Sequence, residues 1–201
     1  MDAIVYELKD SLYLNITNRC TNRCTFCVRY KIRLFNGRYP LWLEKEPTAE
    51  EILSAIGDPS RYKEIVFCGY GEPLIRLETV KEIAQRLKGL GPKIRIDTNG
   101  EANLFHQRNI LPELKGIIDI LSVSLNTESP EVYNKICRSI YGEKAYPAII
   151  DFIKESKKYI PKVEVTVVDI PEVDIAKAKR IAEELGVDFR VRPYYEEKYR
   201  A

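Results

Sequence analysis

The chain has 201 residues, 45% of them hydrophobic, which is enough for one folded domain around a buried core. Its 32 Lys and Arg residues nearly balance its 30 Asp and Glu residues, so the net charge of +2 neither indicates nor excludes a polyanionic partner. This composition excludes a disordered or collagen-like chain. No stretch approaches the roughly 18 consecutive apolar residues of a spanning helix, and the N-terminus is unlike a secretory signal, so we expect a cytoplasmic protein without a membrane segment.

Short β-branched runs alternate with helical patterns along the chain. The predicted strands are residues 12–17, 64–68, 93–98, 118–125, 163–168 and 188–192. The predicted helices are residues 48–56, 77–91, 102–116, 129–138 with a second piece at 146–159, and 174–186. The first helix begins with a capping box, in which Thr48 is the N-cap and Glu51 follows three residues later. We expect the third helix to be interrupted at Pro112.

The repeated order of strand and helix predicts parallel strands joined by right-handed crossovers. The fold is therefore α/β, either an open doubly wound sheet or part of a barrel, because six strands are too few for a full eightfold barrel of roughly 250 residues. Residues 28–47 form one long connection that does not fit the alternation of strands and helices, and such long loops are usually functional. We predict a single domain over residues 1–201.

Three of the five cysteines are clustered directly after the first predicted strand. Cys20, Cys24 and Cys27 have the spacing CxxxCxxC, and α/β proteins place their chemistry at this edge of the sheet. An odd number of cysteines argues against a disulfide framework. Thiolates bind zinc or iron–sulfur clusters; a structural zinc site needs a fourth ligand, for which Cys68 is the candidate. A [4Fe-4S] cluster on three cysteines would instead leave one iron open.

The sequence CTNRCTFC resembles the cluster-binding signature of the radical S-adenosylmethionine (radical SAM) superfamily. The resemblance implies a [4Fe-4S] cluster on Cys20, Cys24 and Cys27, carried by a loop at residues 18–30. It implies that S-adenosylmethionine (SAM) binds the open iron and is cleaved to a 5′-deoxyadenosyl radical that abstracts hydrogen from a substrate. It also implies an oxygen-sensitive enzyme, an electron donor such as ferredoxin or flavodoxin, and a six-stranded partial (β/α)6 barrel resembling part of a TIM barrel.

Three further motifs end the next three predicted strands. FCGYGEP resembles the GGEP motif, whose backbone carbonyls bind the SAM amino group; glycine there lets the backbone approach the ligand. DTNG resembles an element of glycyl-radical activating enzymes, where the acidic residue, here Asp97, can help to hold a monovalent cation. SVSLN resembles the polar ribose-contacting positions. The SAM-contacting residues that the resemblance implies are Phe26, Gly69, Tyr70, Gly71, Glu72, Asp97, Thr98, Asn99, Ser122, Ser124, Asn126 and Arg138.

Several of these residues also have structural interpretations. Phe26 could belong to the core instead of packing near the adenine. Glu72 or Asp97 could merely cap a following helix. Arg138, which in some relatives would reach the SAM carboxylate, could be a solvated surface arginine.

The remaining features leave alternatives open. Cys68 and Cys137 are too few for a second cluster and are most simply buried small hydrophobes. His106 has no ligand partner nearby and is predicted to be structural. The connection at 28–47 mixes basic and aromatic residues. It is therefore a lid on the barrel, a peptide-binding loop, or a surface that binds single-stranded nucleic acid.

Over its whole length the chain resembles the small radical SAM proteins called TatD family-associated, through LNITNRCTNRCTFC, FCGYGEP, DTNG, SLN and AEELGVDFRVR. This likeness implies an association with a TatD-type hydrolase but no reaction. A protein backbone and a nucleoside, nucleotide or RNA remain as substrate classes. The alternative from another class is a zinc-stabilised nucleic-acid-binding module without SAM chemistry, which leaves the glycines and DTNG unexplained.

Overall fold

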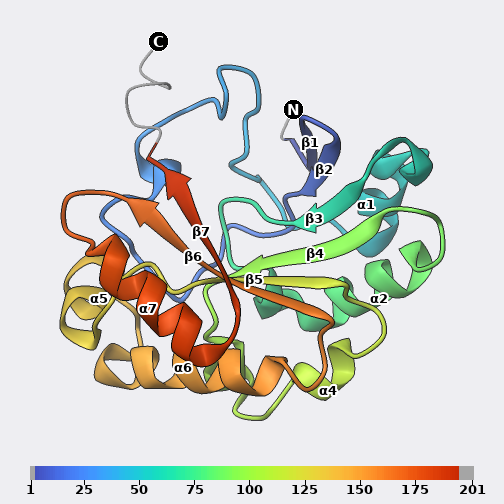
Figure 1. Ribbon diagram of the computed structural model, residues 1–201. Helices are drawn as coiled ribbons and strands as arrows, with labels where there is room; N and C mark the ends of the chain where they lie inside the picture. The colour runs from blue at the N-terminus through green and yellow to red at the C-terminus, as the bar shows by residue number, and fades with distance from the viewer. Residues whose placement is uncertain (1–2, 195–201) are drawn as a thin grey trace.

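A single sheet curled into a half-barrel forms the centre of the computed structural model, which describes residues 3–194 (Figure 1). The strands follow one another in chain order from β1 to β7; β1 pairs with β2 antiparallel, and every later pair is parallel. Their bounds are Val5–Leu8 (β1), Ser11–Leu14 (β2), Glu64–Phe67 (β3), Lys93–Thr98 (β4), Ile120–Ser124 (β5), Lys162–Asp169 (β6) and Asp188–Pro193 (β7). The predicted partial barrel is therefore confirmed.

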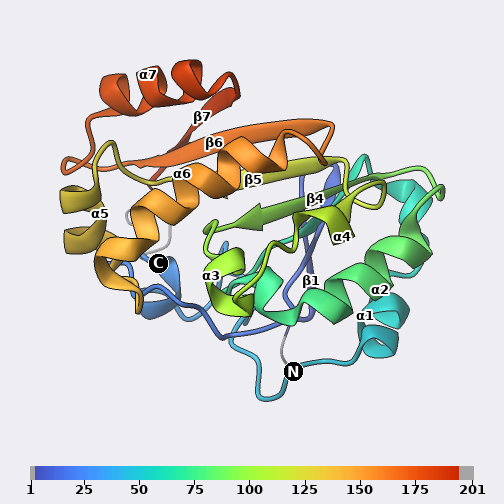
Figure 2. The same cartoon turned by 90° about the horizontal axis from the view of Figure 1, so that it is seen from below.

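Helices cover the outer face of the sheet, as the view from below shows (Figure 2). The α-helices are α1 (Ala49–Ile56), α2 (Leu77–Leu87), α3 (Ala102–His106), α4 (Leu111–Leu114), α5 (Pro130–Cys137), α6 (Ala145–Ser156) and α7 (Ile175–Leu185). Short 3-10 turns are η1 (Val28–Tyr30), η2 (Pro59–Arg61), η3 (Pro73–Arg76) and η4 (Gly142–Lys144). No helix of residues 3–194 has the length and apolar character needed to cross a bilayer.

The first and third predicted helices show how local signals set these bounds. The capping box of α1 is present, because the Glu51 amide donates to the Thr48 hydroxyl and the Thr48 amide donates to the Glu51 carboxylate. The prediction that Pro112 interrupts the third helix was wrong. The chain turns earlier, at Gln107 with φ of 54°, and Pro112 lies in the first turn of α4, where its missing amide hydrogen costs no helical hydrogen bond.

Strand β1 was not predicted, so the sheet has seven strands within the described residues instead of the expected six. It forms a hairpin with β2 through a two-residue turn at Lys9 and Asp10, in which Lys9 adopts a φ of 55°. Asn-Gly and Asp-Gly are the usual signals for such a turn, and Lys-Asp is not one of them.

The two faces of the sheet differ in chemistry because side chains alternate along each strand. Outward residues such as Leu14, Phe67 and Ile96 are fully buried under the helices and join one large apolar cluster. Inward residues are largely polar or charged, and they include Arg95 on β4 and Glu164 on β6. The apolar core therefore lies between the sheet and the helices, and the polar side chains line the inner face of the half-barrel.

The connection at 28–47 runs from one edge of the half-barrel toward the other (Figure 1). Phe35 packs edge-on against Tyr6 of β1, with ring centroids 5.5 Å apart. At the far side, the Lys31 ammonium lies 5.8 Å from the ring centroid of Tyr194, just beyond β7. The segment thus contacts both edges of the sheet, and its role as a lid or a substrate-binding loop stays a prediction.

Candidate functional site

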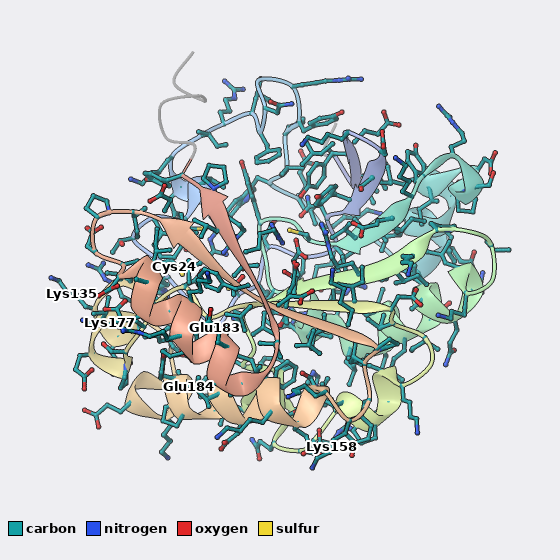
Figure 3. The ribbon with its side chains drawn as sticks, in the orientation of Figure 1. Cys24, Lys135, Lys158, Lys177, Glu183 and Glu184 are labelled. Carbon is teal, nitrogen blue, oxygen red and sulfur yellow. The ribbon has the colours of Figure 1, made fainter. Side chains whose placement is uncertain are left out.

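The three clustered cysteines lie on the loop that follows β2, at the carboxyl edge of the parallel strands. All three are partly exposed. The Cys20 sulfur accepts a hydrogen bond of 3.4 Å from the Asn22 amide, and the Cys24 thiol hydrogen-bonds to the thiol of Cys137. Figure 3 labels Cys24 close to the carboxyl ends of β6 and β7.

Burial governs the acidity of these thiols. It raises the pKa of Cys20 to about 12. The hydrogen bond with Cys137, together with burial, raises the pKa of Cys24 well above its ordinary value. Burial also raises the pKa of Cys27, although the nearby Arg29 guanidinium opposes that shift. The thiols are therefore protonated at neutral pH, and binding of a metal centre releases their protons.

Backbone hydrogen bonds fix the cysteine loop to the end of α5. The Arg23 amide donates to the Cys137 carbonyl at 3.0 Å, and the Thr25 amide donates to the Ile136 carbonyl at 2.8 Å. These bonds also satisfy carbonyls that the last turn of a helix leaves without an intrahelical partner. The position of the loop is thus set by a helix more than a hundred residues away in sequence.

The GYGEP segment packs directly on the start of the cysteine loop. A Cβ at Gly71 would lie 2.3 Å from the Thr17 carbonyl oxygen and 2.6 Å from that of Arg19. A Cβ at Gly69 would lie 2.2 Å from the Asn15 side-chain oxygen. Glycine was predicted here to admit a ligand; the structure gives a different reason, because the chain itself occupies the space.

Glu72 joins the ends of two strands. Its buried carboxylate accepts hydrogen bonds from the Leu74 amide at 3.0 Å, the Thr98 hydroxyl at 2.8 Å and the Asn99 amide at 2.6 Å. The bond from Leu74 caps η3, which confirms that Glu72 caps the helical turn that follows it. Burial raises the pKa of Glu72 to about 7, against the effect of these hydrogen bonds. GYGEP and DTNG are therefore held together by one carboxylate.

Asn99 connects DTNG to the cysteine loop. Its side-chain amide donates to the Thr21 hydroxyl at 2.8 Å, and its nitrogen lies 3.9 Å from the Cys20 sulfur. Its side-chain oxygen accepts a bond of 3.0 Å from the Glu101 amide. Both Asn99 and Thr21 are buried. These contacts bring three of the predicted motifs into one hydrogen-bonded unit.

Asp97 points to the inner face, beside Arg95. The Asp97 carboxylate lies 3.1 Å from the Arg95 guanidinium, which also lies 3.0 Å from the carboxylate of Glu64. Burial raises the pKa of Asp97, and the positive charges of Arg95 and Arg192 oppose that shift. Because a cation already neutralises Asp97, the structure gives no support to a monovalent cation there.

The side chains of Ser122, Ser124 and Asn126 share one side of the sheet. Ser122 accepts a hydrogen bond of 3.2 Å from Arg190, and Ser124 accepts one of 3.3 Å from Arg192. The Asn126 side-chain oxygen accepts a 3.0 Å bond from the same Arg192 nitrogen. Arginines from β7 therefore occupy the space in front of these predicted positions.

Three predicted residues lie outside this network or at its margin. Phe26 is partly buried and packs against the main apolar cluster, in line with its core interpretation. Tyr70 is buried, and its carbonyl accepts a bond of 3.1 Å from Arg29. Arg138 is exposed at the end of α5, where its guanidinium donates to the Lys135 carbonyl.

Sequence reasoning missed several site residues, among them Arg29, Glu101, Tyr133, Arg190 and Arg192. Glu101 is buried beneath the cysteine loop and accepts a 3.0 Å hydrogen bond from the buried Tyr133 hydroxyl. Alternation along β7 could have indicated that Arg190 and Arg192 share a face. The other three carry no local signal, because their partners lie far away in sequence.

The residues present fit an iron–sulfur cluster better than a single metal ion. Within residues 3–194 no three side chains of His, Cys, Asp or Glu converge on one point. The zinc alternative, with Cys68 as fourth ligand, therefore finds no support. Three thiolates of a [4Fe-4S] cluster bind three separate irons and do not need to converge, and three partly exposed thiols on one anchored loop are a suitable donor set.

Comparison with known families agrees with this donor set. Residues 14–185 match the family described as the Radical SAM superfamily. A protein of Thermococcus kodakarensis named "Probable GTP 3',8-cyclase" is 30% identical over 156 residues, which are 77% of this chain and 46% of that protein. A protein of Methanocaldococcus jannaschii with the same name is 29% identical over 92% of this chain and 62% of its own length. The chain thus spans about half the length of the first of these relatives.

Solved structures resemble the fold at low sequence identity. "Structure of TYW1 with a lysine-pyruvate adduct bound" has a TM-score of 0.63 at 16% identity and covers 92% of this chain and 65% of that one. "Crystal structure of methylornithine synthase (PylB)" has a TM-score of 0.62 at 16% identity and covers 92% and 53%. At this identity the likeness shows the fold alone.

Proposed function

The chain belongs to the radical SAM superfamily, and we propose that it holds a [4Fe-4S] cluster on Cys20, Cys24 and Cys27 and cleaves SAM reductively. One observation carries this proposal: the loop that bears the three thiols is hydrogen-bonded to both predicted SAM-binding motifs. Asn99 of DTNG bonds to Thr21 of the loop, and the Glu72 amide of GYGEP donates to the Arg19 carbonyl just before Cys20 at 2.8 Å. When bound, the cluster would supply the electron that cleaves SAM to a 5′-deoxyadenosyl radical.

The protein's own residues would position SAM and keep water away. Glu72 holds the GYGEP and DTNG segments in a fixed relation, because its carboxylate accepts hydrogen bonds from Thr98 and Asn99. Arg29 donates to the carbonyls of Asn18 and Tyr70 and places a positive charge beside Cys27, which favours its thiolate. The segment at 28–47 would limit access of water to the inner face of the half-barrel.

For the substrate we favour a nucleoside or nucleotide over a protein backbone. The support is that several similar proteins are named GTP 3',8-cyclase. RNA belongs to the same chemical class and stays within the proposal. The arginines on the inner face, described below, also suit an anionic substrate better than an uncharged backbone.

The finer predictions have less support. Membership of the TatD family-associated group, the association with a TatD-type hydrolase, the ferredoxin or flavodoxin donor and the cytoplasmic location remain proposals. The monovalent cation near Asp97 is disfavoured by the ion pair of that residue with Arg95.

The test is anaerobic reconstitution with iron and sulfide. We expect about four irons per chain, and release of 5′-deoxyadenosine when dithionite and SAM are supplied. Cys24→Ala should lose iron, whereas Cys68→Ala, which removes a thiol from the inner face, should retain it. Zinc bound in a one-to-one ratio, without SAM cleavage, would overturn the proposal.

A further inference from the structure

The arginines on the inner face of the half-barrel differ in their partners. Arg95 has two carboxylates within 3.1 Å, as described above. Arg190 lies 2.6 Å from the carboxylate of Glu164. Arg192 has no carboxylate at ion-pair distance in the part of the chain between residues 3 and 194. Among the residues that the structure describes, Arg192 is therefore an inner-face cation without an ion-pair partner.

The Arg192 guanidinium is only partly satisfied by hydrogen bonds. One terminal nitrogen donates to Ser124 and Asn126, both of which are neutral. Its Nε is buried and has no hydrogen-bond partner among residues 3–194. A guanidinium carries five N–H donors in a planar fork, and leaving a buried donor unpaired costs more than leaving it in water.

This guanidinium lies between the sheet and the cysteine loop. The Asp97 carboxylate acts on it electrostatically, and the side chains of Cys68 and Cys24 lie near enough to do so when they are ionised. Arg192 is held on β7 in register with Val168 of β6, so its position is set by the sheet and not by a mobile loop. A ligand that reached the interior beside the cysteines would meet Arg192.

We propose that Arg192 binds an anionic group of the substrate, a phosphate or a carboxylate, at the inner face of the half-barrel. This inference rests on the proposed function and narrows its substrate to anionic molecules. A planar fork with an unpaired donor matches two oxygens of one anion, and such charge-assisted bonds are stronger than neutral ones.

The experiment titrates reconstituted, SAM-loaded protein with inorganic pyrophosphate or with glutarate by calorimetry at constant ionic strength. The two probes separate a phosphate source from a carboxylate source. The variant Arg192→Gln removes the charge while Gln can still hydrogen-bond to Ser124. Arg180→Gln removes the same charge from the exposed face of α7 and is the matched control.

We expect the wild type and Arg180→Gln to bind at least one probe, and Arg192→Gln to bind it about tenfold or more weakly, while its affinity for SAM changes far less. If Arg192→Gln does not fold, wild-type protein is treated with phenylglyoxal, which modifies accessible arginines. Pyrophosphate or glutarate should then protect Arg192 and leave Arg180 unprotected, as read by peptide mass spectrometry.

The inference is overturned if the wild type cleaves SAM but binds neither probe. It is also overturned if Arg192→Gln binds the probe as tightly as the wild type, or loses SAM and probe equally. In these cases the proposed function survives. A wild type that holds no iron and cleaves no SAM ends the proposed function, and the inference with it.

Discussion

The side-chain amide of Asn99 donates a buried hydrogen bond of 2.8 Å to the hydroxyl of Thr21, and this bond joins the end of β4 to the cysteine loop. Removal of either partner breaks this buried hydrogen bond. We expect Asn99→Ala and Thr21→Val each to lower the free energy of unfolding by about 1–3 kcal/mol and to reduce the iron retained after reconstitution. In a double-mutant cycle, the combined variant should lose less than the sum of the two. Strict additivity in urea unfolding would show that the bond contributes nothing.

Glu72 should make stability depend on pH. Burial raises its folded pKa to about 7, above the value near 4.5 of an unperturbed glutamate. The folded state then binds a proton more tightly than the unfolded state. Its stabilising effect is complete below the unfolded pKa and is lost as pH rises through about 7.

The size of this effect is up to about 3 kcal/mol between pH 4.5 and 8. Glu72→Gln, which does not titrate, should remove it, so the difference in unfolding free energy between wild type and variant should change with pH over that window. Chemical denaturation at pH 5 and pH 8 measures it. A difference that stays constant with pH contradicts the assigned pKa.

Gly71 should not tolerate a side chain. A Cβ would overlap the carbonyl oxygens of Thr17 and Arg19 at 2.3 and 2.6 Å, and both are backbone atoms that cannot move aside without shifting the cysteine loop. We expect Gly71→Ala to cost about 3 kcal/mol or more and to impair iron retention. Gly89→Ala is the matched control, because no atom lies within 4 Å of its Cβ and only its φ of 85° is unfavourable, which costs about 1 kcal/mol. Equal melting temperatures for the two variants would contradict the steric argument.

Arg29 should anchor the cysteine loop through the shape of its guanidinium. It donates to the carbonyls of Asn18 at 2.9 Å, Tyr70 at 3.1 Å and Asn22 at 3.3 Å. Lys keeps the charge but cannot reach several carbonyls at once. We therefore expect Arg29→Lys to lose iron to a chelator faster than the wild type. Arg23→Lys, on the same loop, serves as the control, and equal loss rates for the two variants would contradict the anchoring role.

Periodicity predicted most of the fold because each strand and helix carries its own hydrophobic pattern. It failed at β1, whose Lys9-Asp10 turn lacks a recognised hairpin signal. In the site, local motifs predicted residues such as Glu72 and Asn99, whose hydrogen-bond partners lie at the ends of neighbouring strands. Arg192 could not be predicted, because its role depends on the register of β7 against β6 and on unpaired charge, neither of which the sequence displays.

The anchoring of the cysteine loop to α5 has a consequence for biosynthesis. Asn22 and Tyr133 are hydrogen-bonded at 2.8 Å although 111 residues separate them, and Arg192 lies later still. A ribosome makes the three cysteines before it makes helix α5, which fixes their loop and follows about a hundred residues later. The nascent chain therefore carries three unconstrained thiols while the intervening segment is made, and iron delivered before α5 is made would meet ligands that are not yet held in place.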